Sequence, residues 1–300
     1  MAPNSKRCGE QLNEQQTPEF VVIGHVCQDI LPTGDRALGG SVSYAAMTAH
    51  RLGYRVGIVT STGPDLDAAQ AFPYAEVISQ PSAATTVFEN IYSNGQRKQI
   101  LHQRADAITC QQIPPAWQRA PMVYLGTIAQ EIDPSVFHFF SAGVLIGVMP
   151  QGFFRQWDGQ GRVSFVAWEP PQEVLQRIDL LVISELDVLD PERLAHDWGR
   201  FADIVVITRA ERGATVYCEG GACHYPARPA EQIDPTGAGD VFTAAFLIRL
   251  AETGDPCQAA SFANVVASFS IEKPGVAGIP SRRKVAEFMN GNDLSLLVPR

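Results

Sequence analysis

The sequence predicts an α/β fold: a three-layer sandwich with a central, mostly parallel sheet and a small β-hairpin lid. Short apolar runs alternate with segments of helical periodicity through most of the chain, which is typical of a sheet covered on both faces. Residues 85–104 form a more polar ribbon around a turn sequence, and the last third carries two long helical segments.

The chain begins with a predicted β-α-β unit. The β-branched run Val21 to Ile23 ends at Gly24, as a buried strand of a parallel sheet does. Small and apolar residues recur at helical spacing from Ser41 to Leu52, and Gly53 is a suitable helix terminator. A second strand follows at Val56 to Val59.

The ribbon at Thr85 to Arg104 predicts a lid. Its apolar residues lie among polar neighbours, so it is too polar for the centre of a parallel sheet, and Asn94-Gly95 suits a tight hairpin turn. We expect the lid to be formed mainly by residues 85–104, with residues 30–38 as a further candidate segment. Because that second segment is short, we expect most of the lid to come from the single later hairpin.

Strands and helices alternate again after the ribbon. The predicted strands are Met122 to Gly126, Val144 to Val148, Leu180 to Ile183, Ile204 to Thr208 and an edge strand at Thr215 to Cys218. The predicted helices are 134–140, 191–201, 237–253 and 256–271, the last two followed by glycine or proline. We expect a single domain at residues 19–300, preceded by a disordered or extended tail at residues 1–18.

Composition narrows the classes of function. The 300 residues are 45% hydrophobic, and 23 Lys+Arg against 32 Asp+Glu give a net charge of -9, which argues against a partner bound through the phosphates of DNA or RNA. The N-terminus is polar, and no segment approaches the roughly 20 apolar residues of a membrane helix. We therefore expect a cytoplasmic protein with neither a nucleic-acid partner nor a membrane partner.

The segment from Asp234 to Asp240, Asp-Pro-Thr-Gly-Ala-Gly-Asp, precedes a predicted helix. Glycines allow close approach of a ligand to the backbone, and amides at a helix N-terminus favour an anion. A carboxylate in the first turn could accept a proton from an attacking hydroxyl, which suggests phosphoryl transfer. The alternative is a glycine-rich cap whose aspartate only complements the helix dipole. Phe242 stands where a dinucleotide fingerprint requires its third glycine, and no Gly-Lys-Ser/Thr of a Walker A loop follows.

Asp234 to Leu247, DPTGAGDVFTAAFL, resembles the C-terminal signature of the ribokinase-like (PfkB) family of carbohydrate and nucleoside kinases. The resemblance implies the ribokinase-like version of the sandwich and an ATP-dependent kinase that uses an alcohol group as acceptor. It implies that Asp240 is the catalytic base. It also implies a phosphate-binding anion hole formed by Thr236, Gly237, Ala238 and Gly239.

Other positions agree with the family from Val21 to Pro280. Asp29 resembles the family's substrate-binding aspartate, and a carboxylate suits this role because it accepts two strong hydrogen bonds from a vicinal diol. Gly39 and Gly40 resemble the di-glycine that meets the substrate. Three further residues resemble the nucleotide side of the family's site: Thr208, Gly213 and Asn264. Each position taken alone has an ordinary structural reading, and their joint order along the chain favours the resemblance.

Some residues depart from the family pattern. Ser184-Glu185-Leu186-Asp187 stands where the family has Asn-x-x-Glu, so Glu185 and Asp187 are the candidates for placing Mg²⁺ indirectly, through water. Ala210 replaces a glycine of the nucleotide turn, and Tyr44 replaces an asparagine of the sugar kinases. Arg155 is a further candidate for the rim of the substrate site, with an ordinary surface arginine as the alternative.

The resemblance implies ATP and Mg²⁺ as cofactors, with a monovalent cation near Asp234 and residues 276–278 as a further candidate. We expect phosphotransfer to a hydroxyl of a small polyol, first a cyclitol such as myo-inositol, otherwise a nucleoside or sugar, by a monomer or homodimer. The alternative is a catalytically degenerate member that binds a nucleotide or sugar, suggested by Ser184 and Ala210. An NAD-dependent oxidoreductase is disfavoured by the missing third glycine.

Overall fold

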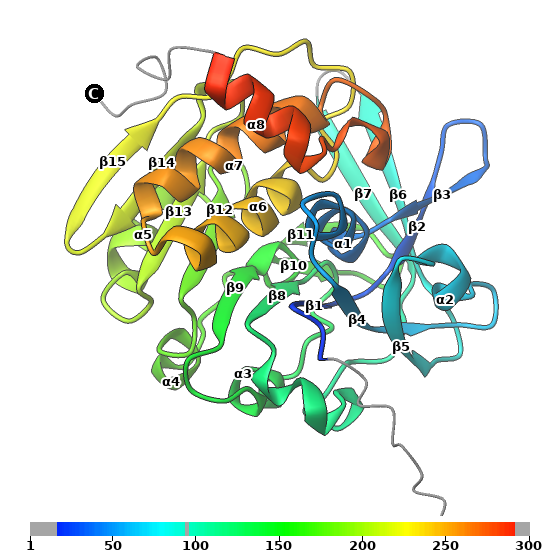
Figure 1. The fold of residues 1–300 in the computed structure, drawn as a ribbon. Coiled ribbons are helices and arrows are strands. Elements are labelled where there is room, and N and C mark those ends of the chain that lie inside the picture. Colours follow the sequence, from blue (N-terminus) through cyan, green and yellow to red (C-terminus); the bar gives the residue numbers. More distant parts are fainter. Residues whose placement is uncertain (1–16, 94–95, 292–300) are drawn as a thin grey trace, which may run out of the picture.

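Nine strands form the central sheet in a computed structural model that describes residues 17–93 and 96–291 (Figure 1). In spatial order they are β15 (Gly221–Tyr225), β14 (Ala214–Cys218), β13 (Ile204–Thr208), β12 (Leu180–Ser184), β9 (Leu145–Met149), β8 (Met122–Gly126), β1 (Phe20–Ile23), β4 (Val56–Thr62) and β5 (Ala75–Pro81). The seven strands from β13 to β5 are parallel, and β14 and β15 are antiparallel to their neighbours. The predicted mostly parallel sheet is confirmed.

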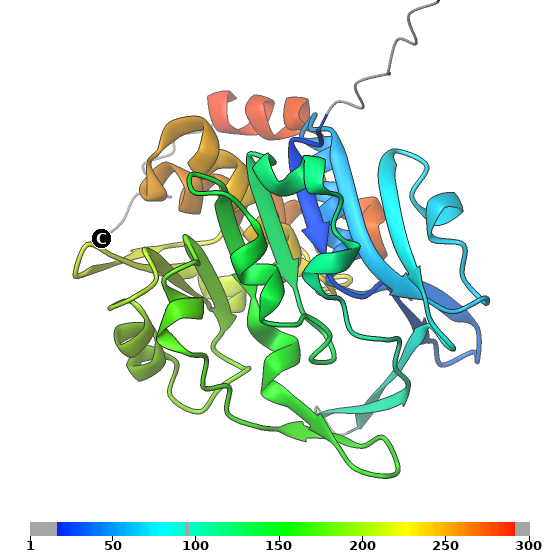
Figure 2. The same ribbon diagram turned by 90° about the horizontal axis from the view of Figure 1, so that it is seen from below.

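Helices cover both faces of this sheet (Figures 1 and 2). One face carries α1 (Ser41–Arg51), α6 (Ala238–Thr253), α7 (Pro256–Ser270) and α8 (Arg282–Gly291). The other carries α3 (Ser135–Phe139), α4 (Gln172–Leu175) and α5 (Pro191–Trp198), while α2 (Ala68–Ala71) follows β4. Five short 3₁₀ turns complete the described elements: η1 (Cys110–Gln112), η2 (Pro115–Arg119), η3 (Pro150–Phe154), η4 (Ala210–Arg212) and η5 (Gly275–Gly278).

Alternate residues of each central strand pack into two separate hydrophobic cores, one on each face of the sheet. In β8, Tyr124 faces the core under α1 and α6, whereas Val123 and Leu125 face the core under α3, α4 and α5. In β12, Val182 and Ile183 divide in the same way. This two-residue period explains why strands buried on both faces are continuous apolar runs in the sequence.

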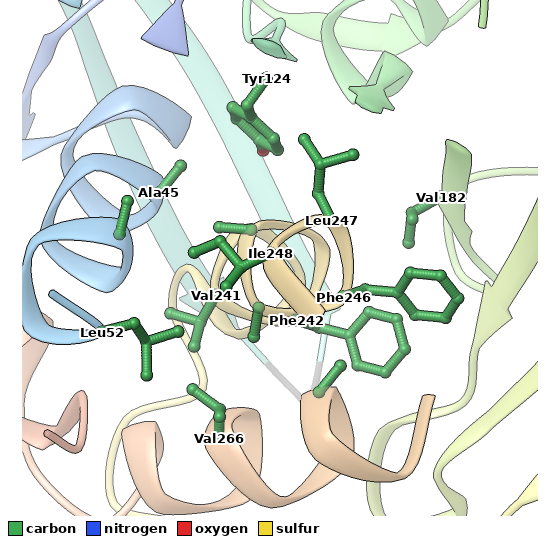
Figure 3. Packing of buried hydrophobic residues seen from close by; sticks show 14 of the residues in the cluster. Ala45, Leu52, Tyr124, Val182, Val241, Phe242, Phe246, Leu247, Ile248 and Val266 are labelled. Carbon is green, nitrogen blue, oxygen red and sulfur yellow. The ribbon is translucent and has the colours of Figure 1, made fainter. Parts of the chain in front are cut away.

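Helix α6 is the central helix of the molecule. It packs between the sheet, α1 and α7, and Figure 3 shows its side chains pointing toward all three. Ten of its sixteen residues are buried, including Phe242, Phe246 and Leu247. A helix that is apolar on all sides is buried on all sides, so the elements packed around it fix its position. Its first turn, which carries the predicted base, is therefore fixed relative to the sheet.

The lid is larger than we expected. It is a four-stranded sheet in the order β3 (Arg36–Gly39), β2 (Cys27–Ile30), β6 (Thr86–Ser93) and β7 (Gln96–Gln103). The later hairpin supplies the two long strands, β6 and β7, of eight residues each. The β2–β3 hairpin, which spans the further candidate segment at residues 30–38, adds two strands of four residues each, and β2 pairs in parallel with β6. The predicted turn at Asn94-Gly95 and residues 1–16 of the predicted tail lie outside the described residues.

A second ribbon, β10 (Arg155–Trp157) with β11 (Val163–Phe165), extends the lid region. The amide of Leu101 on β7 donates to the carbonyl of Gly161 in the turn between β10 and β11 at 2.8 Å, and Ile100 bridges to Arg162. The lid is thus attached to residues that follow β9. Across the described residues, no helix has the length and apolar character needed to cross a membrane.

Candidate active site

The predicted site residues gather where the parallel strands end. The chain runs from β1 to β4 and β5 on one side and returns through β8, β9, β12 and β13 on the other, so the order reverses between β1 and β8. Open α/β sheets bind ligands at the carboxyl edge beside such a reversal. Gly24 and Gly126 end these two strands in close contact, since a Cβ on Gly24 would lie 2.1 Å from the carbonyl oxygen of Gly126.

Asp240 lies in the first turn of α6 at this edge, with 8% of its surface exposed. The hydroxyl of Tyr124, from β8, donates a hydrogen bond to its Oδ1 at 2.6 Å. Burial raises the pKa of Asp240 to about 6, while hydrogen bonds from Tyr124 and Ser41 and the nearby charge of Arg155 act in the opposite direction. A carboxylate in this range is ionised near neutral pH and can still take up a proton.

The residues before Asp240 form a turn that can hold an anion. Gly237 has a left-handed backbone (φ 73°), and a Cβ there would lie 2.2 Å from the ring of Tyr44, so both conformation and space require glycine. The amide of Thr236 donates to Asp234, and that of Ala238 to the carbonyl of Pro235. The amides of Gly237 and Gly239 lie at the start of α6, where a helix leaves its N–H groups without intrahelical acceptors.

The residues predicted to bind the acceptor lie together at the base of the lid. Asp29 on β2 is opposite Ala37 of β3, and its Oδ2 lies 2.0 Å from where a Cβ on Gly39 would be. Gly39 therefore provides the space that the Asp29 carboxylate occupies. Gly40 caps α1 with φ 89°, and a Cβ there would lie 2.6 Å from the carbonyl oxygen of His25. These close contacts within the chain are sufficient to explain why both positions are glycine, whether or not a ligand binds there.

Arg155 lies between the lid and Asp240. The side chain starts from β10, and the residue is 9% exposed, which removes the alternative of an ordinary surface arginine. Its guanidinium donates to the carbonyl of Ile128 at 2.9 Å and lies over the ring of Phe88, 5.6 Å from the centroid. Its charge lowers the pKa of both Asp240 and the buried thiol Cys27, although burial raises both more strongly. The role of Arg155 at the rim of the substrate site stays a prediction.

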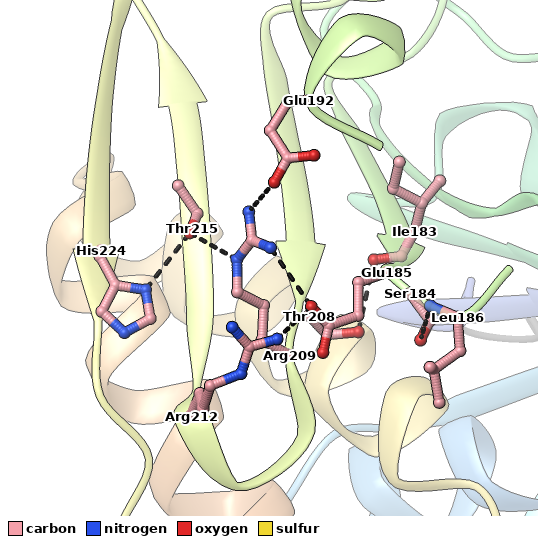
Figure 4. Close-up of polar contacts among 10 residues, drawn as sticks. All are labelled: Ile183, Ser184, Glu185, Leu186, Glu192, Thr208, Arg209, Arg212, Thr215 and His224. Atoms are coloured by element: carbon pink, nitrogen blue, oxygen red, sulfur yellow. Dashed lines mark hydrogen bonds and ion pairs between the residues drawn. The ribbon is translucent and has the colours of Figure 1, made fainter. Parts of the chain in front are cut away.

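A cluster of ion pairs occupies the donor side, beyond the ends of β12 and β13 (Figure 4). The Arg209 guanidinium contacts Glu185 at 3.3 Å and Glu192 at 2.9 Å, and its Nε donates to Thr215 at 3.0 Å. Arg212 also pairs with Glu185. The Glu185 carboxylate therefore neutralises two arginines, which fits an indirect Mg²⁺ role poorly.

Asp187 fits that role better. Its Oδ2 accepts from the amide of Ser184 at 3.2 Å and its Oδ1 from the side chain of Gln151 at 3.3 Å. Its charge raises the pKa of Asp240, which shows that the two carboxylates lie in electrostatic reach of each other. Oxygen ligands beside the phosphate turn suit Mg²⁺, which keeps several waters. Within residues 17–93 and 96–291 no group of three or more His, Cys, Asp or Glu residues could hold a metal directly.

The predicted nucleotide turn contains two residues with positive φ, Ala210 and Gly213. Ala210 has a positive φ of 49°, so alanine occupies the backbone conformation for which glycine is favoured, at a cost of about 1 kcal/mol. Gly213 has φ 95° and lies against the carbonyl of Tyr225. Thr208 ends β13 and donates to the carbonyl of Ile183 at 3.3 Å. The roles of Thr208 and Gly213 toward a nucleotide stay predictions.

Asn264 lies on α7 and is 4% exposed. Its side-chain amide donates to the carbonyls of Tyr225 at 2.9 Å and Pro226 at 3.3 Å. These bonds fasten the chain after β15 to α7. The amide nitrogen is thus committed to the backbone, and the role of Asn264 toward adenine stays a prediction. Asp234 similarly accepts from the amide of Gly275 at 2.8 Å, which places it beside the residues predicted to border a monovalent cation.

Sequence reasoning missed two residues of the site. Tyr124 and Ser41 both hydrogen-bond Asp240, and neither was singled out. A signal existed for Tyr124, because a phenol inside an otherwise apolar buried strand needs a partner for its hydroxyl. Ser41 directly follows the di-glycine and is 3% exposed, so its hydroxyl also had to find a partner.

Comparisons with known proteins agree with this geometry. The family model described as pfkB family carbohydrate kinase matches residues 184–282, from the end of β12 to the start of α8. The chain is similar to a cytidine kinase of Thermococcus kodakarensis, with 29% identity over 259 residues, 76% of this chain and 87% of that protein. It is also similar to an inositol 3-kinase of Zea mays, with 25% identity over 284 residues, 86% of this chain and 73% of that protein.

The fold is also that of solved ribokinase-family structures. One of them, a pyrophosphate-dependent kinase in the ribokinase family, superposes with a TM-score of 0.75 at 24% identity, covering 89% of this chain and 99% of that one. The matched family model and these solved structures support a ribokinase-like PfkB carbohydrate kinase. The kinase-named relatives and the matched family model support a kinase enzyme, and the sheet and helices form the ribokinase-like sandwich that the sequence predicted.

Proposed function

We propose that this kinase transfers a phosphoryl group from ATP to a hydroxyl of a small, uncharged polyol. A cyclitol such as myo-inositol is the first candidate, and a nucleoside or simple sugar is the second. The observation that carries the proposal is the buried Asp240, placed beside the amides of Gly237 and Gly239 at the carboxyl edge of the sheet. A base and an anion turn in one place are what phosphoryl transfer to an alcohol needs.

The charges around Asp240 favour a neutral acceptor. Asp29, Asp187 and Asp240 bring three carboxylates, and Arg155 brings one guanidinium, which already donates to a carbonyl. An acceptor with its own phosphate or carboxylate would enter a net negative site. Hydroxyl groups, in contrast, can donate to Asp29 and accept from Arg155. The names of similar proteins, cytidine kinase, fructokinase and inositol 3-kinase, also support a neutral, hydroxyl-rich acceptor.

Each group has a distinct role in this proposal. Asp29 and the Gly39-Gly40 backbone orient the acceptor, and the lid excludes water. Asp240 takes the proton of the attacking hydroxyl while the amides of the anion turn stabilise the transferred phosphoryl group. Mg²⁺, held through water near Asp187, would neutralise charge on the donor phosphates.

The donor side also suits a second donor. Arg209 and Arg212 lie at the ends of β13 and η4, and the Arg212 side chain is 57% exposed. Arg209 is held by its ion pairs with Glu185 and Glu192. The Arg212 guanidinium pairs with Glu185 but is exposed, so it can also bind phosphate oxygens without contacting a base. A structurally similar protein is named as a pyrophosphate-dependent kinase. Pyrophosphate is therefore the second candidate donor, and it differs from ATP in leaving orthophosphate as the product.

The test is a matrix of donors and acceptors. The purified protein with Mg²⁺ is incubated with ATP or pyrophosphate and with myo-inositol, cytidine, ribose or fructose, and the phosphorylated acceptor is identified by mass spectrometry. We expect one acceptor to give turnover with ATP, with ADP formed in equal amount. Glucose 6-phosphate serves as the charged acceptor and should give none. Turnover only with a phosphorylated or carboxylated acceptor would contradict the proposal, and turnover with pyrophosphate alone would replace ATP as the donor.

A further inference from the structure

Tyr124 is a buried group with no role in the function proposed so far. It lies in the middle of β8, its surface is fully buried, and its ring belongs to the core under α1 and α6 (Figure 3). A phenylalanine at this position would fill the same space in the core. The hydroxyl instead donates to Oδ1 of Asp240 at 2.6 Å, across 116 residues of sequence. A short hydrogen bond to a charged carboxylate is among the stronger polar contacts in proteins.

We propose that Tyr124 is a positioning residue for phosphoryl transfer: its hydroxyl fixes the rotation of the Asp240 carboxylate and keeps it ionised at neutral pH. This inference rests on Asp240 acting as the base. Tyr124 would not touch the acceptor or the donor, and it would act through Asp240. Ser41, from the start of α1, supports the same carboxylate with a second hydroxyl.

The physical need for such a residue follows from burial. A carboxylate without water is destabilised relative to its neutral form, so a buried aspartate without donors would be protonated at pH 7 and unable to act as a base. Tyr124 keeps its own proton, because burial and the neighbouring Asp240 both raise its pKa well above the usual range for tyrosine. It therefore remains a donor over the whole pH range in which Asp240 titrates.

Other charged groups around Asp240 come from separate elements. Arg155 on β10 favours the ionised form of Asp240, and Asp187 after β12 disfavours it. Cys27 on β2 is a buried thiol whose pKa is raised, mainly by burial, so it remains neutral. Tyr124 and Ser41 are the groups from β8 and α1 that hydrogen-bond the carboxylate. Removing the Tyr124 hydroxyl should therefore raise the pKa of Asp240 and leave the other groups in place.

The experiment measures kcat/KM against pH for the wild-type protein and for Tyr124→Phe, with the acceptor and donor found active. Phenylalanine preserves the ring that fills the core. We expect the acidic limb to move upward by about one pH unit, so that the loss is about eightfold larger at pH 5.5 than at pH 8.5. Ser41→Ala should move the limb in the same direction. Tyr74→Phe is the matched control, because Tyr74 is partly buried and stacks on His50, near the C-terminal end of α1, whereas Ser41 of the site begins that helix.

The outcomes separate this inference from the proposed function. An acidic limb that does not move in Tyr124→Phe, with an equal loss at every pH, overturns the positioning role and leaves only a packing role. If Asp240→Asn retains full activity, the base itself is misassigned, and the proposed mechanism fails before Tyr124 is considered. A limb that moves equally in Tyr74→Phe would also contradict the inference, because the effect would then be unspecific.

Discussion

Asp29 and Arg155 carry opposite charges at the proposed acceptor side, and each is held by a close contact with its neighbours. The Asp29 carboxylate fills the space beside Gly39, and Arg155 is held between the Ile128 carbonyl and the ring of Phe88. Binding groups held in this way lose little conformational entropy when a substrate arrives. Selectivity for the acceptor should therefore respond to changes at these residues more than overall stability does.

Arg155→Met should weaken binding of the acceptor more than binding of the donor. We expect kcat/KM for the acceptor to fall by about tenfold to a hundredfold, since a charged hydrogen-bond donor is lost, with the KM for the donor nearly unchanged. Arg104→Met is the matched control. Arg104 donates to the carbonyls of Ala129 and Gln130 and lies over Trp157, so it has the same kind of contacts beside the lid. Equal losses in both variants would assign Arg155 to the structure of the lid alone.

Gly39→Ala should displace the Asp29 carboxylate, because the new Cβ would lie 2.0 Å from its Oδ2. A displacement of about 1 Å at a positioning group costs roughly a hundredfold in kcat/KM. Gly221→Ala is the control, since its nearest neighbour would be 3.7 Å away. Steady-state kinetics with both variants test this prediction. An Asp29 role in substrate binding would be contradicted if Gly39→Ala kept the acceptor KM of the wild type.

At the scale of elements, the structure attaches the lid to the body at two places. The β2–β3 hairpin continues directly into α1, and the turn between β10 and β11 hydrogen-bonds β7 through Gly161 and Leu101. Arg155 is the first residue of β10, so the second attachment also reaches the acceptor side. Loosening it should affect lid closure and acceptor binding together.

Gly161→Ala tests this attachment. Gly161 has φ 75°, and a Cβ there would lie 2.3 Å from the carbonyl of Leu101. We expect faster hydrogen exchange at the amide of Leu101, by about tenfold, together with a higher acceptor KM. Gly159→Ala, two residues away, has nothing within 4 Å of the new Cβ and should leave both unchanged. Unchanged exchange in Gly161→Ala would show that the two ribbons are not coupled through this turn.

The elements differ in how well the sequence predicted them. The strands Met122–Gly126 and Ile204–Thr208 were predicted with the observed bounds, because a strand buried on both faces is a continuous apolar run. Strands β2 and β3 were missed, because their sequences, Cys-Gln-Asp-Ile and Arg-Ala-Leu-Gly, have no clear alternation and four residues each. The pairing of β2 with β6 depends on contacts about 60 residues apart in sequence, which no local pattern contains.

The candidate site residues were also predicted where a local motif contains them and missed where they depend on contacts distant in sequence. Asp240, Asp29, Gly39 and Gly40 belong to local motifs, and the structure brings them to one edge of the sheet. Tyr124 and Ser41 were missed because they act only through contact with Asp240, which is distant in sequence. The roles of all these residues in catalysis and binding remain predictions.

At the scale of the whole molecule, burying Asp240 should reduce stability at neutral pH. Its pKa is about 6 in the folded protein and about 4 in an unfolded chain, so the folded state holds the proton more tightly. The free energy of unfolding should therefore fall as pH rises from about 4 to 6, by up to roughly 3 kcal/mol from this group. In the proposed mechanism, this loss of stability accompanies the ionised base that the site requires.

Asp240→Asn should consequently be more stable than the wild type above pH 6. We expect a gain of about 1–3 kcal/mol at pH 8 that disappears toward pH 4, where the aspartate is neutral in both states. Urea unfolding at pH 4.5 and pH 8 measures it, with Asp203→Asn as a distant control. A gain of the same size at both pH values would show that ionisation of Asp240 is not its cause.

Single-turnover phosphotransfer by Asp240→Asn, with the active donor and acceptor, tests the role of Asp240 as the base. We expect a rate about a hundredfold to ten-thousandfold below that of the wild type, with both ligands still bound at near wild-type affinity. Phosphotransfer at the wild-type rate would contradict this role, because the carboxylate at the start of α6 would then not be the base.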